Sequence, residues 1–124
     1  MRIFTNRWFA RFARKEALTD TQLCDAIERA ERDLIDADLG GDLIKQRVAR
    51  KGQGKRGGYR TIIAYRQGQR AFFLYGFAKS ERANIEDDEL AAFRKAAVEL
   101  HALSDELLNR AVESGVLSEV NCHV

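Results

Sequence analysis

The sequence predicts an α+β fold in which helices precede and follow a mainly antiparallel sheet. Towards both ends of the chain, apolar residues recur every three or four positions, which is the spacing of one buried helical face. Between these segments, two runs rich in β-branched and aromatic residues are separated by Gln67-Gly68-Gln69, a short connection that suits a hairpin. N-terminal helices packed on the sheet and a C-terminal helical segment satisfy both patterns. We expect one domain over residues 1–124, with 114–124 as a flexible or partner-binding tail.

The N-terminal part is expected to contain a strand at about residues 2–5 and a short helix near Trp8–Phe12. A longer helix should run from about Thr21 to Asp36, because Asp20 is a suitable N-cap and one apolar face continues along this segment. The apolar face consists of Leu23, Ala26, Ile27, Ala30, Leu34 and Ile35. Gly40-Gly41 then ends the helical region.

The sheet is expected to come from the middle of the chain. Leu43–Arg50 has an extended pattern, and the glycines of residues 52–58 mark a long basic loop whose backbone can approach a ligand closely. Tyr59–Arg66 and Arg70–Ala78 follow as antiparallel neighbours. Because side chains alternate along a strand, Arg60, Ile62, Ala64 and Arg66 should share one face, opposite Tyr59, Thr61, Ile63 and Tyr65.

Two further helices are expected near the C-terminus, one through Leu90–Leu103 and one through Leu107–Val112. The acidic run Glu86–Glu89 precedes the first of them. Carboxylates at the start of a helix complement its positive dipole end, and we favour this reading over a metal site.

Basic residues are concentrated in the predicted sheet. Between Leu43 and Ser80 there are ten basic residues and no Asp or Glu, although the net charge of the whole chain is only +2. The ten are Lys45, Arg47, Arg50, Lys51, Lys55, Arg56, Arg60, Arg66, Arg70 and Lys79. The flanking segments carry the acidic excess. A solvated charged surface is the simpler reading, but this sorting favours a site for a polyanion.

Several classes of function fit the sequence poorly. No apolar run is long enough to cross a bilayer, and charges interrupt each apolar stretch of the N-terminus, so we expect a cytoplasmic protein without a membrane partner. Lys55 lacks the Gly-Lys-Ser/Thr context of a P-loop. The spacing of Cys24 and Cys122 matches neither a metal nor a redox motif, and we expect Cys24 to be a small buried thiol. No cofactor or metal is expected.

Three segments resemble the RelE/HigB group of toxins from bacterial toxin-antitoxin systems, and the resemblance as a whole extends over most of residues 1–105. They are Gly52-Gln53-Gly54-Lys55-Arg56-Gly57-Gly58-Tyr59-Arg60-Thr61, Phe73-Leu74-Tyr75-Gly76-Phe77-Ala78-Lys79-Ser80-Glu81-Arg82-Ala83-Asn84-Ile85, and Leu39-Gly40-Gly41 followed by Lys45-Gln46-Arg47-Val48. The resemblance implies a toxin with a RelE/ParE-like fold, which cleaves mRNA in the ribosomal A site. It also implies neutralisation by a co-encoded helix-turn-helix antitoxin, through which alone the toxin meets operator DNA.

By position, Arg60 matches the strand arginine of the group, and Lys79 and Arg82 match its basic cluster after the last strand. Lys51 and Lys55 fall at its loop cations. The candidate catalytic residues are therefore Lys55, Arg60, Lys79 and Arg82, and the candidate RNA-binding residues are Arg47, Arg50, Lys51, Lys55 and Arg56. Ser80 stands where other members carry another arginine, and neither Tyr nor His follows closely, so the resemblance supplies no acid/base pair.

Such a site needs no metal, because the 2′-hydroxyl of RNA is itself the nucleophile and cations stabilise the crowded phosphate. Neighbouring cations lower the pKa of a lysine, so Lys55 and Lys79 are the candidates for the base, with Arg60 and Arg82 holding phosphate. Two other functions remain open. One is a ParE-like toxin that binds DNA gyrase, and the other is a noncatalytic RNA-binding module.

Overall fold

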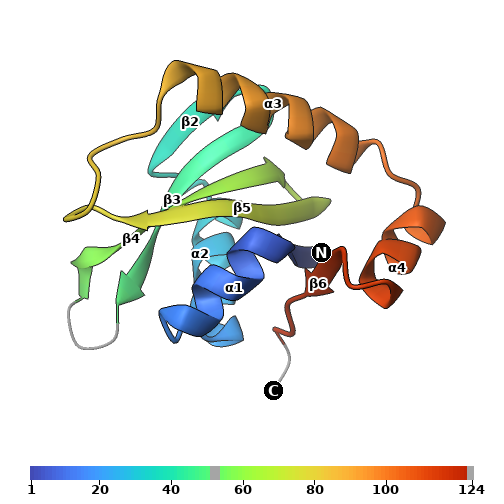
Figure 1. Ribbon diagram of the computed structural model, residues 1–124, viewed down its shortest axis with the longest axis horizontal. Coiled ribbons are helices and arrows are strands. Elements are labelled where there is room, and N and C mark those ends of the chain that lie inside the picture. Colours follow the sequence, from blue (N-terminus) through green and yellow to red (C-terminus); the bar gives the residue numbers. More distant parts are fainter. Residues whose placement is uncertain (51–53, 123–124) are drawn as a thin grey trace.

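A computed structural model describes residues 1–50 and 54–122, with the side chains of residues 54–56 left out. The order of elements agrees with the expected α+β class (Figure 1). They are β1 (Arg2–Asn6), α1 (Arg7–Lys15), α2 (Asp20–Glu31), β2 (Ala37–Gly40), β3 (Leu43–Arg50), β4 (Gly54–Arg66), β5 (Arg70–Ala78), α3 (Asp87–His101), α4 (Asp105–Glu113) and β6 (Leu117–Glu119). No helix among the described residues is long and apolar enough to cross a membrane.

The strands form one sheet in the order β2-β3-β4-β5-β1-β6. Neighbouring strands are antiparallel except β1 and β5, which run parallel. A parallel pair needs a long connection between its strands, and here the connection contains α1, α2 and the strands β2 to β4. β1 pairs with only the first part of β5, residues 70–73. The second half of β5 therefore has α1 rather than a strand near it.

Each face of the sheet is covered by helices (Figure 1). α1 and α2 cover one face, where Phe9, Ile27 and Ile63 are buried together. α3 and α4 cover the other, where Ile62, Phe72 and Leu108 are buried. The predicted alternation along β4 is thus confirmed. On β5 a register shift opposite Ile62 and Ile63 places the consecutive residues Leu74 and Tyr75 on the α3 side, which simple alternation could not predict.

The longer N-terminal helix ends earlier than expected, at Glu31 rather than Asp36. Asp33 has a φ of 62°, a left-handed conformation that cannot continue an α-helix. Gly40 and Gly41 also have positive φ, but they turn the chain between β2 and β3 instead of ending a helix.

The C-terminal segment differs from the expected flexible tail. β6 lies antiparallel to β1, and the Val120 amide donates to the Ile3 carbonyl at 2.8 Å. This strand carries Cys122 to α2, where it forms a disulfide with Cys24 across a sequence separation of 98. The expectation of a free thiol at Cys24 was therefore wrong, because the pairing depends on β6 and not on spacing along the chain.

The glycine-rich loop is shorter than expected, because β4 already begins at Gly54. Gly58 lies within the strand and is buried. A Cβ at this position would lie 2.2 Å from the Val48 carbonyl oxygen of β3. Contact between strands, rather than with a ligand, therefore requires glycine here.

Gly58→Ala is expected to lower the free energy of unfolding by about 2 kcal/mol or more, since β3 and β4 must separate to admit the methyl group. Urea unfolding followed by circular dichroism measures this change. Gln69→Ala, in the exposed turn after β4, is the control and should leave the midpoint unchanged. An unchanged midpoint in Gly58→Ala would show that the strands accommodate the methyl group.

Candidate functional site

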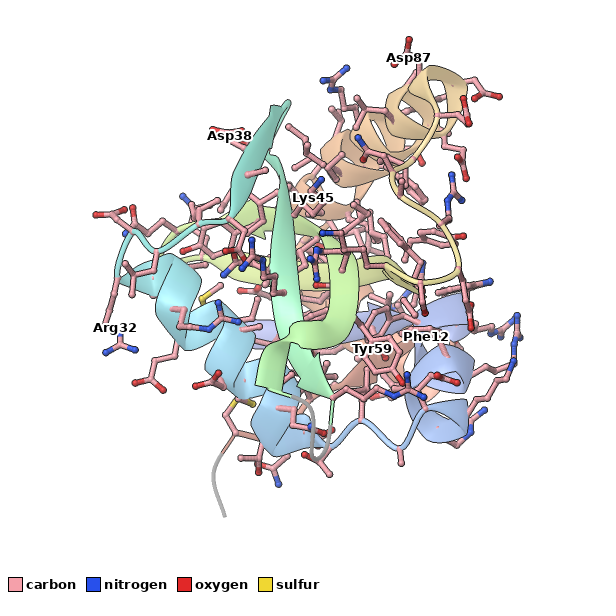
Figure 2. All side chains as sticks on the ribbon, turned by 90° about the vertical axis from the view of Figure 1, so that its left-hand side faces the viewer. Phe12, Arg32, Asp38, Lys45, Tyr59 and Asp87 are labelled. Carbon is pink, nitrogen blue, oxygen red and sulfur yellow. A yellow bond between two sulfur atoms is a disulfide. The ribbon has the colours of Figure 1, made fainter. Side chains whose placement is uncertain are left out.

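Four cations gather on the α3 side of the sheet, towards the end that carries the β3–β4 connection. The strand register places Arg47 beside Arg60, and Arg60 beside Phe77 of β5. Lys45 lies two residues before Arg47 on the same face of β3, and Lys79 directly follows β5. Figure 2 shows Lys45 on the side of the sheet where α3 begins at Asp87, with Tyr59 and Phe12 on the opposite side. We call Lys45, Arg47, Arg60 and Lys79 the cation row.

The cation row differs from Arg66 and Arg70, two other basic residues of β4 and β5, in its partners. Arg66 is bound to Asp42 at 2.9 Å, and Arg70 is bound to Asp105 at 2.8 Å. Within the described part of the chain, no charged side-chain nitrogen of the cation row lies within 4.0 Å of a carboxylate oxygen. The charge of the acid-free segment is therefore neutralised at the far end of the sheet and left available at the cation row.

Arg60 is the most constrained member of this row. Its side chain is half-buried, and its Nη1 atom is buried without a hydrogen-bond partner in the protein. A buried donor that makes no hydrogen bond costs about 1–3 kcal/mol, and more when the group is charged. A phosphate oxygen is a suitable acceptor for such an atom, because a guanidinium presents several donors in a fixed plane.

The backbone beneath the cation row is fixed by buried polar groups that sequence reasoning missed. The Arg47 amide donates to Asp36 Oδ2 at 2.7 Å, and Arg29 Nη2 donates to the Arg47 carbonyl. Gln46 is fully buried, and its Nε2 donates to the Ala26 carbonyl at 2.9 Å. The available signal was Gln46 itself, a polar residue on the alternating apolar face of Leu43–Arg50.

The guanidinium of Arg82, a candidate phosphate ligand, donates its hydrogen bonds to other residues of the protein. Its Nη2 donates to Glu89 Oε1 at 2.6 Å, its Nη1 to the Tyr75 hydroxyl at 3.1 Å, and its Nε to the Asn84 carbonyl at 2.9 Å. The guanidinium also lies 5.6 Å from the centre of the Phe77 ring. These contacts tie the segment after β5 to the sheet and to the first turn of α3.

The acidic run lies at the start of α3, where the sequence predicts that it complements the positive end of the helix dipole. Glu86 is the N-cap of α3 and forms a capping box with Glu89. Among the described residues, no cluster of metal-binding side chains occurs. Glu89 has a second role that the sequence did not reveal: its hydrogen bonds from Arg82, with a weaker one from the Glu86 amide, lower its pKa to about 2.

The pairing of Glu89 with Arg82 predicts how this part of the site responds to pH. A lowered pKa in the folded state stabilises the fold above the ordinary value of 4.5, and this contribution is lost as the pH falls through about 2. Arg82→Ala should therefore move the titration midpoint of Glu89 from about 2 towards 4.5, as measured by carboxyl NMR. Arg94→Ala removes an arginine from the same helix that contacts Leu39 instead, and should leave the midpoint unchanged. Equal midpoints in wild type and Arg82→Ala would contradict the pairing.

The remaining candidate cations are separated from the cation row or lie outside the described residues. Arg50 ends β3 with its guanidinium 5.6 Å from the centre of the Tyr59 ring, which lies on the α1 side. Burial, with a hydrogen bond to Glu16, raises the pKa of Tyr59. Lys51 falls outside the described residues. Lys55 and Arg56 belong to β4, but their side chains are not among those described.

The sequence of the chain matches a family of known proteins. The family model described as the RelE toxin of the RelE/RelB toxin-antitoxin system matches residues 1–120, nearly the whole chain. The chain belongs to the RelE family. A search of curated proteins found no match. In this RelE-family chain the strand arginine Arg60 and Lys79 lie on one open surface, whereas Arg82 serves as an internal clamp.

Proposed function

We propose that this RelE-family toxin is a ribosome-dependent mRNA endonuclease that inhibits translation. The observation that supports it best is the cation row, whose members lack carboxylate partners while Arg66, Arg70 and Arg82 are paired. Unpaired cations on a structured surface favour binding of a polyanion. The buried Nη1 of Arg60 favours a phosphate oxygen in a fixed position.

The proposed reaction uses the 2′-hydroxyl of RNA as nucleophile. Its oxygen forms a bond to the adjacent phosphorus while the bond from phosphorus to the 5′-oxygen breaks, which leaves a 2′,3′-cyclic phosphate and a free 5′-hydroxyl. Arg60 stabilises the charge that develops on the phosphate oxygens, and Arg47 holds the neighbouring phosphate. Lys79 is the proposed base that accepts the proton of the 2′-hydroxyl, with Lys55 as the alternative, and a water molecule gives the leaving 5′-oxygen its proton.

Lys79→Ala is expected to lower the rate of RNA cleavage about a hundredfold, because the nucleophile then lacks its base. Lys79→Arg keeps the positive charge but not the proton acceptor and should be equally slow. Lys95→Ala removes an exposed lysine on α3 and serves as the control. Single-turnover cleavage rates measure the three variants, and full activity in Lys79→Arg would contradict the role as base.

The biological setting forms part of the same proposal. As a member of this family, the toxin is expected to be neutralised by a co-encoded helix-turn-helix antitoxin and to meet operator DNA only through it. We place it in the cytoplasm, where mRNA and ribosomes are its targets.

A gyrase-binding toxin and a noncatalytic RNA-binding module are the alternatives. Expression in a translating extract, with mapping of mRNA 5′ ends, separates the three. Cuts aligned with codons support the endonuclease. Intact mRNA with stalled gyrase supports the first alternative, and intact mRNA bound by the protein supports the second.

A further inference from the structure

A groove of about 310 Å³ lies between α1, the second half of β5 and the segment that follows β5. It begins where β1 ceases to pair with β5. Five aromatic side chains line it: Trp8, Phe12, Tyr59, Tyr75 and Phe77. Trp8 lies 5.3 Å from Phe12 and 4.5 Å from Tyr75 between ring centres, and 38% of Trp8 is exposed. A partly exposed aromatic group of this kind offers a stacking surface for a flat ligand.

The walls of the groove are fixed by tight packing. A Cβ on Gly76 would lie 2.6 Å from Phe12 Cε2, so α1 rests directly on the backbone of β5. On the same side, the hydroxyl of the buried Tyr59 donates to Glu16 Oε1 at 2.7 Å. The groove is therefore formed before any ligand binds, which limits the entropy cost of binding.

The charges around the groove match a nucleotide. Lys15 lines it and supplies positive charge for a phosphate, and the exposed Arg50 lies beside Tyr59. Arg82 also lines it, but its guanidinium is bound to Glu89. Glu16 and Glu81 also line it. Carboxylates repel phosphate but accept hydrogen bonds from the exocyclic amino groups of adenine, cytosine and guanine, which uracil lacks.

The groove meets the cation row at the edge of β5, although Phe12 and Tyr59 in its wall lie on the opposite side of the sheet (Figure 2). Phe77 lines the groove and is also the register neighbour of Arg60. Adjacent strands lie only about 4.8 Å apart, so an RNA strand whose phosphate contacts Arg60 reaches the edge of β5 within the next nucleotide. The cation row can hold phosphates but presents few exposed aromatic rings. The groove presents aromatic rings on which a base can stack.

We propose that this groove binds one base of single-stranded RNA, next to the phosphate held by Arg60, and prefers adenine or cytosine to uracil. This proposal rests on RNA being the ligand of the cation row. It adds a contact that selects the base, whereas the cation row recognises the backbone. An apolar side chain of a protein partner would also fit the rings, but it would offer no hydrogen-bond donor to the two carboxylates.

Trp8 is the only tryptophan of the chain, so its fluorescence reports directly on the groove. The probes are short 2′-O-methyl oligonucleotides, which the toxin cannot cleave, made of adenine, cytosine, uracil or abasic units. The adenine and cytosine probes should quench Trp8 and bind at least about tenfold more tightly than the abasic probe, a ratio expected for one stacked base. The uracil probe should bind more weakly than either.

Two variants locate the effect. Trp8→Ala should weaken binding of the adenine probe about tenfold, and Trp8→Phe, which keeps a ring, should restore most of it. Leu34→Ala, an exposed apolar residue of the α2–β2 connection, is the control and should change nothing. Equal binding of all four probes would overturn the proposal. A Trp8→Ala variant that binds the antitoxin more weakly but the adenine probe as tightly as wild type would overturn it too. If the wild-type toxin cleaved no RNA but its Trp8 fluorescence were still quenched by the adenine and cytosine probes, the endonuclease proposal would fail and the groove proposal would stand.

Discussion

Replacing Arg60 with alanine is expected to lower RNA cleavage about a thousandfold, because a preorganised donor at the reacting phosphate contributes about 10²–10³ in rate. Arg60 sits between Arg47 and Phe77 in the strand register, and its Nη1 atom is buried without a protein acceptor. The variant should fold normally, because no ion pair is lost. Cleavage rates together with a thermal unfolding curve measure both expectations.

Arg66→Ala is a matched control for this experiment. Arg66 lies on the same strand and the same face as Arg60, but it is exposed and paired with Asp42 at 2.9 Å. Its removal should leave cleavage unchanged. Arg60→Lys should recover only part of the rate, since an ammonium keeps the charge but lacks the planar set of donors. Equal activities of Arg60→Ala and Arg66→Ala would refute the role of Arg60.

Breaking the disulfide between Cys24 and Cys122 is expected to lower the free energy of unfolding by about 4 kcal/mol. The bridge closes a loop with a sequence separation of 98, and the chain-entropy relation gives up to about 4.7 kcal/mol for a loop of that size. Urea unfolding of Cys24→Ala, Cys122→Ala and the double variant measures this. All three should lose the same amount, because either substitution removes the same bond. A double variant as stable as the oxidised wild type would contradict the prediction.

The disulfide is expected to affect stability rather than catalysis. It joins α2 to the end of the chain, whereas the cation row faces α3 on the other side of the sheet. In a reducing cytoplasm the dithiol form should prevail, so the toxin there is expected to be less stable but equally active per folded molecule. Cleavage rates measured with and without reductant test this separation.

The sequence was sufficient for most of the fold because the relevant signals are local. The period of two along Tyr59–Arg66 placed Ile62 and Ile63 on opposite faces of the sheet, and the Gln67-Gly68-Gln69 connection indicated the hairpin. The disulfide and β6 were missed because they depend on contacts between the two ends of the chain, which no local pattern records.

The candidate site was predictable as a set of cations but not as an arrangement. Composition could not distinguish Arg60 from Arg66, because their difference comes from Asp42, which the β2–β3 turn brings beside Arg66. Arg82 likewise has the sequence position of a phosphate ligand, but in the fold Glu89 of α3 binds it. Charge alone thus identified the surface, and the ion pairs formed on folding decide which cations remain available.

The most direct test of the endonuclease uses purified ribosomes that carry a defined mRNA, incubated with wild-type toxin, Arg60→Ala or Arg66→Ala. We expect wild type and Arg66→Ala to cut the mRNA within the A-site codon, to leave a 2′,3′-cyclic phosphate, and to leave the same mRNA intact without ribosomes. Arg60→Ala should cut about a thousandfold more slowly. Intact ribosome-bound mRNA with wild-type toxin, or cleavage that does not require Arg60, would contradict a phosphate site at the cation row.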